Sequence, residues 1–195
     1  ARALFAVGGA DLAPMLNGEP LRMWTTVYAA PGDRLSFAEP RQGARAYLAI
    51  SGGFGIEEWL GSKSTNLLAA VGGFEGRRLK AGDRLSFGPR AESGVPGITA
   101  GRSIVPHYSP HPTVRVLPGA EFALLTAKAE AEFREGSFTV TNDSNRMGYR
   151  LAGPRLHLLN RKELLSAAVD FGTVQLMPDG SLTVLMADHQ TTGGY

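Results

Sequence analysis

The sequence predicts a mainly β fold, with many short strands, tight turns and few helices. Its 195 residues include 25 glycines and 12 prolines, a composition that suits short strands joined by tight turns better than long helices. Short apolar runs alternate with turn residues along most of the chain. Only residues 120–134 have a clear helical period. We therefore expect a mostly-β scaffold that carries polar loops.

Size and charge exclude several classes of protein. A chain of this length can bury one sizeable core or two small ones. The net charge is only +2, and no basic stripe with interleaved aromatic residues is present, so we expect no nucleic-acid partner. The absence of cysteine excludes disulfides, thiolate metal sites and a cysteine nucleophile. No run approaches the ~18 apolar residues of a membrane span, and no signal sequence opens the chain, so we expect a cytoplasmic protein.

The first half of the chain is predicted to form short strands. These are expected at Leu4–Val7, Leu21–Tyr28, Leu35–Phe37 and Tyr47–Ile50. The hexapeptide Gly-Asp-Arg-Leu-Ser-Phe occurs twice, at residues 32–37 and 82–87. Glycine and aspartate favour a turn, and the leucine and phenylalanine can anchor the strand that follows. The repeat therefore indicates a hairpin device used twice.

Residues 54–65 are predicted to be helical. Phe54–Leu60 is expected to form a short helix, and a second is expected to begin at Gly61. The stretch is not a phosphate-binding Walker motif, because lysine does not follow the second glycine directly. A helix start at Gly-Ser-Lys-Ser can still hold an anion through free N–H groups and Lys63. The alternative is a capped helix with a solvated lysine.

Residues 93–112 are predicted to link two domains, 1–92 and 113–195. The segment is rich in glycine, serine and proline and has little periodicity. It contains His107 and His111, whose spacing of four would suit a metal site on a helix. Prolines at positions 106, 110 and 112 exclude that helix, so we expect no metal site.

The second domain is predicted to contain one helix among strands. Apolar residues of Ala120–Arg134 recur on one helical face, and Gly136 is a candidate C-cap. Strands are expected at Val114–Leu117, around Phe138 and Val140, at Leu156–Leu159 and at Gly172–Met177. This helix is interpreted as a packing element.

A polar stretch, residues 142–150, separates two of these strands. Its asparagine, aspartate and serine favour self-bonded turns, and Gly148 permits an unusual backbone conformation. Arg146 and Arg150 are expected to form a fork for a carboxylate or a phosphate. The alternative is an ion pair of these arginines with Asp143 or Asp188.

The last stretch, residues 173–195, is predicted to be a β-hairpin that ends in a site. Apolar runs flank the turn residues Pro178–Ser181, and the second run, Leu182–Ala187, is apolar on both faces. It stops at Asp188, and a carboxylate, an imidazole, an amide and two hydroxyls then precede two glycines. A buried strand that delivers such groups to a rim is typical of a functional site. A polar loop in which Asp188 only caps the turn is the alternative.

Several ordered motifs resemble one family along residues 4–195. The motifs are Asp-His-Gln-Thr-Thr-Gly-Gly-Tyr at 188–195, Ser-Asn-Arg-Met-Gly-Tyr-Arg-Leu-Ala-Gly-Pro at 144–154, Gly-Ala-Asp-Leu at 9–12, Tyr-Leu-Ala-Ile-Ser-Gly-Gly at 47–53, Leu-Gly-Ser-Lys-Ser-Thr at 60–65 and Gly-Gly-Phe-Glu-Gly-Arg at 72–77. They closely resemble the allophanate hydrolase subunit 2 family, also called the KipA or biotin-dependent carboxyltransferase-like family, which includes the C subunit of prokaryotic 5-oxoprolinase. The resemblance implies cyclophilin-like β-barrels in two linked subdomains. It also implies roughly another third of sequence, mostly before residue 1, and a strand after Tyr195.

The resemblance further implies a subunit of an ATP-dependent 5-oxoprolinase. Such a subunit would work with a KipI-like (allophanate hydrolase subunit 1) protein and a LamB/YcsF-like subunit to open a small cyclic amide. Asp188 would act on protons, and Lys63 would orient carboxylate or phosphoryl groups. The substrate-binding residues would be Ser64, Arg146, Tyr149, Arg150, Gln175, Gln190, Thr191 and Thr192. We expect residues near 63, 146–150 and 188–192 to converge on one rim.

Two other functions fit the same resemblance. The first is a biotin-dependent carboxyltransferase acting on urea, which requires a biotin carboxylase and a biotinylated carrier. The second is a non-catalytic KipA-type protein that binds a histidine-kinase inhibitor. The sequence departs from the family after Ser166, where Ala167 and Ala168 replace a usual acidic residue.

Overall fold

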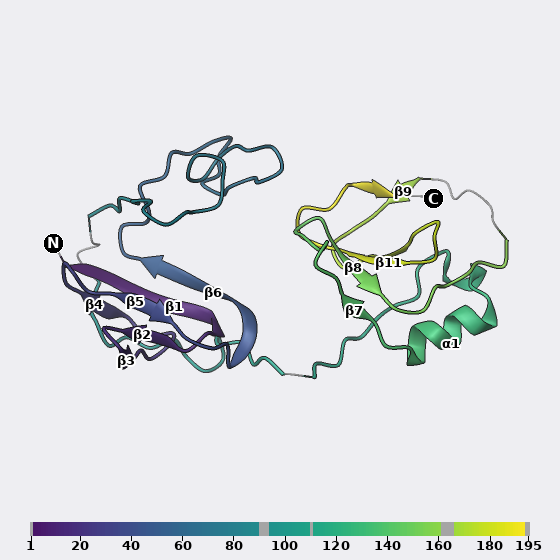
Figure 1. Cartoon of the computed structure of the whole chain (residues 1–195), viewed down its shortest axis with the longest axis horizontal. Coiled ribbons are helices and arrows are strands. Elements are labelled where there is room, and N and C mark those ends of the chain that lie inside the picture. The colour runs from purple at the N-terminus through teal and green to yellow at the C-terminus, as the bar shows by residue number, and fades with distance from the viewer. Residues whose placement is uncertain (1, 90–93, 110, 161–165, 194–195) are drawn as a thin grey trace. The chain divides into compact units, whose positions relative to one another are not determined.

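The chain is divided by its internal contacts into two units, Ala1–Val114 and Arg115–Tyr195. A computed structural model describes residues 2–89, 94–109, 111–160 and 166–193 (Figure 1). Both units consist mainly of β-strands, and the residues so described contain one α-helix and one short 3-10 helix. The predicted class, mainly β with a few short helices, is confirmed. The exact domain boundaries predicted from composition stay a prediction.

The first unit contains two antiparallel sheets of three strands each. One has the order β4-β1-β6 and the other the order β3-β2-β5. Their strands are β1 (Ala3–Asp11), β2 (Pro14–Leu16), β3 (Glu19–Pro20), β4 (Val27–Ala29), β5 (Leu35–Phe37) and β6 (Gln42–Ile50). Leu4, Phe5 and Val7 are buried because β1 is the central strand of its sheet. The predicted strand Leu21–Tyr28 is wrong over most of its length, since regular pairing begins only at Val27.

The repeated hexapeptide forms the same turn in both copies. Asp33 accepts a hydrogen bond from the N–H of Ala30 (2.7 Å), and Asp83 accepts one from the N–H of Lys80 (2.6 Å). The backbone N–H of each aspartate donates in return, at 3.1 Å in both turns. The glycine before each aspartate has φ near +90°, a conformation that favours glycine. The turn of the predicted hairpin device is confirmed in both copies, but a strand (β5) follows only the first, because in the second only Phe87 pairs, in an isolated bridge with Phe54.

The helices predicted between residues 54 and 65 are wrong. Trp59 and Ser62 form an isolated antiparallel bridge instead, with both backbone hydrogen bonds present. Between them Leu60 has φ +48° and Gly61 has φ +75°. Positive φ at both central residues is the signature of a two-residue hairpin turn, and it is incompatible with a right-handed helix. Lys63 therefore follows a hairpin turn and does not begin a helix.

Part of the predicted linker is hydrogen-bonded to the first unit. Thr25 pairs with Thr99 in an isolated bridge, and their hydroxyls lie 3.0 Å apart. The hydroxyl of Thr26 donates to the carbonyl of Val95 (2.8 Å). The backbone N–H of Ala100 donates to the carbonyl of Trp24 (2.9 Å). These bonds attach residues 95–100 to the segment that leads into β4.

The second unit is built on a four-stranded antiparallel sheet with the order β10-β11-β8-β7. Its strands are β7 (Thr139–Val140), β8 (Gly148–Ala152), β10 (Val174–Leu176) and β11 (Leu182–Leu185), and a separate pair is formed by β9 (Ala167–Ala168) and β12 (Thr192–Gly193). Figure 1 shows helix α1 (Ala127–Glu135) on one side of the sheet and β9 on the other. The predicted hairpin is confirmed, because Met177 and Ser181 close the turn between β10 and β11 with a 2.8 Å bond.

The core of the second unit lies between α1 and the sheet. Ala129, Leu156 and Leu182 are buried, and partly buried apolar residues surround them: Leu125, Phe133, Phe138, Leu151, Val174 and Leu176. Side chains of successive strand residues point to opposite faces of the sheet. The apolar residues of this core therefore share the face toward α1, and the residues between them in sequence lie on the opposite face.

Helix α1 is shorter than the sequence predicts. A 3-10 helix (η1, Phe122–Leu124) precedes it, and Leu125 is extended. The hydroxyl of Thr126 then accepts a hydrogen bond from the N–H of Ala129 (3.1 Å) and caps the new helix. Gly136 is the C-cap as predicted, although its φ is −71°.

Two predicted strands of the second half are not formed as such. Residues 114–117 have no strand pairing, and within 156–159 only Leu158 pairs, in an isolated bridge with Leu125. The bridge at Leu158 is flanked by two backbone hydrogen bonds, from Thr126 to His157 (3.0 Å) and from Leu159 to Leu124 (2.7 Å), and it stops there because helix α1 begins at Ala127. Within the described ranges no helix is long and apolar enough to cross a membrane.

Candidate functional site

The ends of β8 and β11 bring two predicted site segments together. Gly148 of β8 pairs with Leu185 of β11, and the backbone ladder continues beyond both strands. The N–H of Met186 donates to the carbonyl of Met147 (3.0 Å). The N–H of Asp188 donates to the carbonyl of Arg146 (2.8 Å). Residues 42 positions apart in sequence therefore lie side by side.

Arg146 and Asp188 form a two-bonded ion pair on this ladder. Nε of Arg146 lies 2.7 Å from Oδ2 of Asp188, and Nη2 lies 2.9 Å from Oδ1. The hydrogen bonds from Arg146 lower the pKa of Asp188, against a small opposing effect of burial. Of the alternatives that the sequence left open, the ion pair is the one observed. Each oxygen of Asp188 accepts one of these bonds and keeps a second lone pair, and the lowered pKa makes the carboxylate a weaker base.

Arg150 is held differently from Arg146. Its backbone N–H donates to the hydroxyl of Ser144 (3.0 Å), and its Nη1 donates to the backbone carbonyl of Asp143 (2.9 Å). Over the ranges that the structure describes, no carboxylate pairs with Arg150. The side chain is exposed. Its guanidinium therefore retains donors for an anionic ligand.

Gln175 and Gln190 form a second contact between predicted site residues. Nε2 of Gln190 donates to Oε1 of Gln175 at 3.1 Å, and both side chains are half-buried. The neighbouring carbonyl of Thr191 accepts from the N–H of Val169 (3.1 Å), and Thr192 pairs with Ala168. The backbone of residues 191–193, which directly follows Gln190, is thus paired with residues 167–169.

The register separates Tyr149 from the other predicted residues of the sheet. Tyr149 pairs with Val184, so both lie on the face that carries Leu151 and packs toward α1. Arg150 points to the opposite face. Sequence reasoning also missed Thr183, the polar residue that pairs with Arg150. The interruption of the apolar run of β11 by a threonine is the signal that would have revealed it.

Lys63 and Ser64 belong to the first unit, whereas the residues described above belong to the second. Both side chains are exposed, and the N–H of Ser64 donates to the hydroxyl of Ser62 (3.1 Å). No helix in the described ranges begins there, so the predicted set of free helical N–H groups is absent. The convergence of Lys63 with the residues of the second unit stays a prediction.

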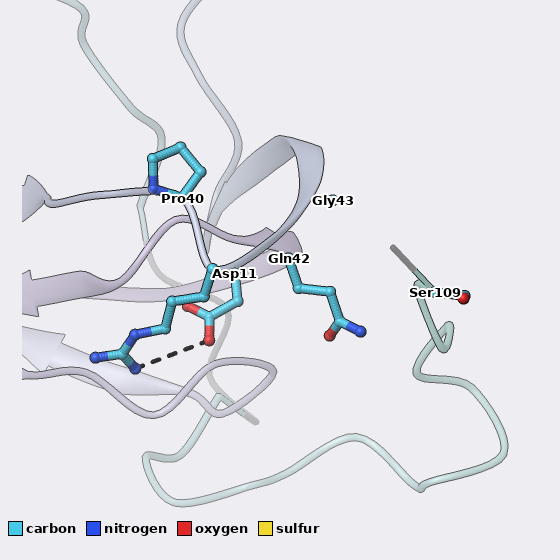
Figure 2. Close-up of a pocket in the computed structure, with 6 residues that line it drawn as sticks. Asp11, Pro40, Gln42, Gly43 and Ser109 are labelled. Atoms are coloured by element: carbon cyan, nitrogen blue, oxygen red, sulfur yellow. Dashed lines mark ion pairs between the residues drawn. The ribbon is translucent and has the colours of Figure 1, made fainter. Parts of the chain in front are cut away.

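The first unit also has a cavity of about 400 Å³, shown in Figure 2. It is lined by Asp11, Pro40, Arg41, Gln42, Gly43 and Ser109. Oδ1 of Asp11 accepts a hydrogen bond from the N–H of Ala13 (2.8 Å), and Oδ2 of Asp11 lies 3.9 Å from Nη1 of Arg41. The amide of Gln42 donates to the carbonyl of Tyr108. The Asp11 carboxylate and the Gln42 amide nitrogen are thus partnered within the chain. In the part of the chain that the structure covers, no cluster of three metal-ligating side chains occurs.

Comparison with known proteins identifies the family of this domain. The family described as "Carboxyltransferase domain, subdomain A and B" matches residues 1–195, and the chain belongs to this family. It is 36% identical to the 5-oxoprolinase C subunit of Haemophilus influenzae over 98% of this chain, and the match covers 60% of that relative. The 5-oxoprolinase C subunit of Escherichia coli matches equally well, at 36% identity with the same coverage. The chain thus spans about 60% of the length of these relatives.

Urea-processing enzymes are also similar. A putative urea carboxylase of Emericella nidulans is 31% identical over 78% of this chain, and the match covers 13% of that enzyme. The crystal structure of Kluyveromyces lactis urea amidolyase superposes with a TM-score of 0.81 at 26% identity, covering all of this chain and 13% of the enzyme. These relatives contain the fold as a small part of a much longer chain.

Proposed function

We propose that the chain belongs to the C subunit of a 5-oxoprolinase-type complex, which opens a small cyclic amide with hydrolysis of ATP. The observation that supports this most is the 36% identity to two relatives that bear the name of the 5-oxoprolinase C subunit, over 98% of the chain. The urea carboxylase match is weaker and shorter. The proposed partners are a KipI-like protein and a LamB/YcsF-like subunit.

The second unit supplies the proposed substrate site. Arg150 retains donors and is assigned to the substrate's negative charge. Gln175, Gln190 and Thr191 are assigned to the amide. Asp188 is assigned to positioning Arg146, because its two carboxylate oxygens accept hydrogen bonds from Nε and Nη2 of that guanidinium. Its lowered pKa makes it a weak base.

ATP is proposed to be bound mainly by another subunit. The chain's own phosphate candidate, Lys63, follows a hairpin turn and lacks the row of free N–H groups that a phosphate cradle needs. The described residues around Lys63 therefore do not form a nucleotide site by themselves. Phosphate transfer in the complex would supply the driving force for opening a stable amide.

The test is a reconstituted complex. The full-length protein is co-purified with the products of neighbouring genes and assayed for glutamate formed from 5-oxoproline and water with ATP. Glutamate formation coupled to ATP hydrolysis is expected. Equal ATP hydrolysis with and without 5-oxoproline contradicts the proposal. Stable association without turnover of any small amide indicates a binding protein instead.

Arg146, which Asp188 positions, is assigned to the substrate as well, and a matched pair of variants tests this assignment. Arg146→Gln is expected to lower kcat/KM by at least about tenfold, as expected for loss of a charged hydrogen bond in a site. Arg155→Gln is the control, because Arg155 forms a similarly exposed ion pair with Asp179 (2.6 Å) in the same unit. Equal losses in both variants would mean that Arg146 has only a structural role.

A urea carboxyltransferase is the second proposal, favoured by the structural match to urea amidolyase. It requires biotin on a separate carrier, and the described residues suggest no biotin site. Transfer of a carboxyl group from carboxybiotin to urea by the full-length protein, without turnover of 5-oxoproline, would favour this function over the first.

A further inference from the structure

The cavity of the first unit lies where β1 ends and β6 begins (Figure 2). Asp11, the last residue of β1, pairs with Gln42, the first residue of β6. Directly paired residues of antiparallel strands place their side chains on the same face, and both of these side chains line the cavity. The backbone N–H of Arg41 donates to the carbonyl of Asp11 (2.8 Å). One strand pair thus brings three polar residues to the same cavity.

The Asp11 carboxylate is fixed at one oxygen and open at the other. Oδ1 accepts a hydrogen bond from the N–H of Ala13 (2.8 Å), two residues further along the chain. Such a bond from a nearby backbone N–H holds an aspartate side chain in one orientation. Oδ2 accepts no hydrogen bond in the described ranges, although a carboxylate oxygen can accept two. Asp11 therefore offers a negatively charged acceptor to the cavity.

The Arg41 guanidinium lies beside this open oxygen without a hydrogen bond to it. The 3.9 Å between Nη1 of Arg41 and Oδ2 of Asp11 is beyond hydrogen-bond distance. The side chain of Arg41 is 70% exposed, so the pair is weak and is separated at little cost. Among the residues that the structure describes, none accepts a hydrogen bond from this guanidinium, and its five N–H donors are available. Two opposite charges thus stand next to each other, each open to a ligand.

Gln42 adds a neutral acceptor whose orientation is defined. Its amide donates to the backbone carbonyl of Tyr108. A carbonyl can only accept, so the amide group bonded to it is the NH₂ and the other is the oxygen. Oε1 of Gln42 accepts no hydrogen bond from the described part of the chain. A second acceptor is thus available on the face that carries the Asp11 carboxylate.

These groups match the head group of a free α-amino acid. Its ammonium has three N–H donors, and its carboxylate is attached to the same carbon, so its two charges are also adjacent. A simple anion attracted by Arg41 would be repelled by Asp11, and a simple cation attracted by Asp11 would be repelled by Arg41. The opposed charges therefore favour a zwitterion over either ion alone. The volume of about 400 Å³ is within the range of small-molecule sites.

We propose that this cavity binds a free α-amino acid in its zwitterionic form. Oδ2 of Asp11 and Oε1 of Gln42 accept hydrogen bonds from the ammonium, and the Arg41 guanidinium binds the carboxylate. Gly43 and Ser109, which also line the cavity, are small and leave room for the side chain of the ligand. The site shares no residue with the site of the proposed function, so either proposal can fail alone.

Titration of the full-length protein with four small compounds tests the need for both charges. L-Alanine carries both on one carbon, propionate lacks the ammonium, and ethylamine lacks the carboxylate. We expect L-alanine to bind at least about tenfold more tightly than propionate or ethylamine, because each of these lacks one set of charged hydrogen bonds. β-Alanine, whose charges are one carbon further apart, is expected to bind more weakly than L-alanine, and the reverse order contradicts the α-amino acid. Equal affinities, or no measurable binding of L-alanine, overturn the proposal.

Nuclear magnetic resonance shifts of the backbone amides measure these affinities and locate the ligand. The amides of Ala13 and Gly43 are expected to shift most on addition of L-alanine, because Ala13 bonds the Asp11 carboxylate and Gly43 lines the cavity. Shifts confined to the second unit would show that L-alanine binds elsewhere and would overturn the assignment. The titration of the unaltered protein decides the proposal even where a variant does not fold.

Two variants and a matched control test the named residues. Asp11→Asn keeps the acceptor for Ala13 and removes the charge, and it is expected to weaken L-alanine binding at least about tenfold. Arg41→Gln is expected to reduce the affinity for L-alanine to that for ethylamine. Arg155→Gln is the control, because Arg155 forms an exposed ion pair with Asp179 in the second unit, and it should leave the affinity unchanged. Equal losses in all three variants would assign the effect to the net charge of the protein and overturn the site.

Discussion

Replacing Asp188 with asparagine tests how much the ion pair with Arg146 stabilises the second unit. Asparagine keeps the shape of the side chain and removes its charge. The pair has two short hydrogen bonds, but the side chains of Arg146 and Asp188 are 65% and 52% exposed. Exposed ion pairs contribute about 0.2–1 kcal/mol, and two-bonded pairs lie at the upper end. We therefore expect Asp188→Asn to lower the free energy of unfolding by no more than about 1 kcal/mol.

The pH dependence of this loss has a defined sign. Arg146 lowers the pKa of Asp188 in the folded protein. The unfolded value for aspartate is about 3.9. A lowered folded pKa stabilises the fold above the unfolded value, and this stabilisation disappears as the pH falls through the folded value. The difference in free energy of unfolding between the parent protein and Asp188→Asn should thus be largest at pH 7 and vanish at low pH.

Urea unfolding followed by circular dichroism at pH 7 and at stepwise lower pH measures this difference. High salt at pH 7 should also reduce it, because about 1 M salt screens charges beyond a few ångströms. A loss of about 3 kcal/mol or more would show that the pair is not a surface ion pair. A loss that stays constant below about pH 3 would show that the charge of Asp188 is not its cause.

Three further substitutions test the core and its ends by urea unfolding. The hydroxyl of Thr141 is buried without a hydrogen-bond partner in the described ranges, so Thr141→Val should raise stability by about 1 kcal/mol, and a loss would reveal a hidden partner. Leu185 is 2% exposed, so Leu185→Ala should cost about 2–5 kcal/mol, and a cost under about 1 kcal/mol would mean that the site collapses. Thr126→Ala should cost about 1 kcal/mol through loss of the cap on Ala129, whereas Thr126→Asp should cost less, and equal costs would show that the cap is not the cause.

Turns were the features that sequence reasoning predicted best. The repeated hexapeptide places Asp33 and Asp83 where each closes a turn with a residue three positions earlier. The hairpin turn at Pro178–Ser181 is also closed by a contact between near neighbours, the hydrogen bond from the N–H of Met177 to the carbonyl of Ser181. Such contacts depend on neighbours in sequence, and a short window contains all the atoms involved. Helix α1 was found for the same reason, although its start was placed too early because the cap at Thr126 was not recognised.

Residues 54–65 show where local reasoning fails. The sequence predicts a short helix at Phe54–Leu60 and a second that begins at Gly61. The structure has a two-residue turn with Leu60 at positive φ, a conformation that a bulky residue adopts only when its surroundings impose it. The bridge between Trp59 and Ser62 closes that turn. Because no helix forms there, the anion-binding helix start expected at Lys63 is not formed either.

The sequence by itself determined the mainly β class, the turns and the family, because composition, turn chemistry and ordered motifs are properties of the chain read in order. It also named Arg146, Arg150, Asp188 and Gln175 as candidates. Only the tertiary structure decided that Arg146 pairs with Asp188 and that Arg150 stands in line with Gln175. Strand register settles this, and a slip of one residue would send each side chain to the other face. No local stretch of sequence contains that information.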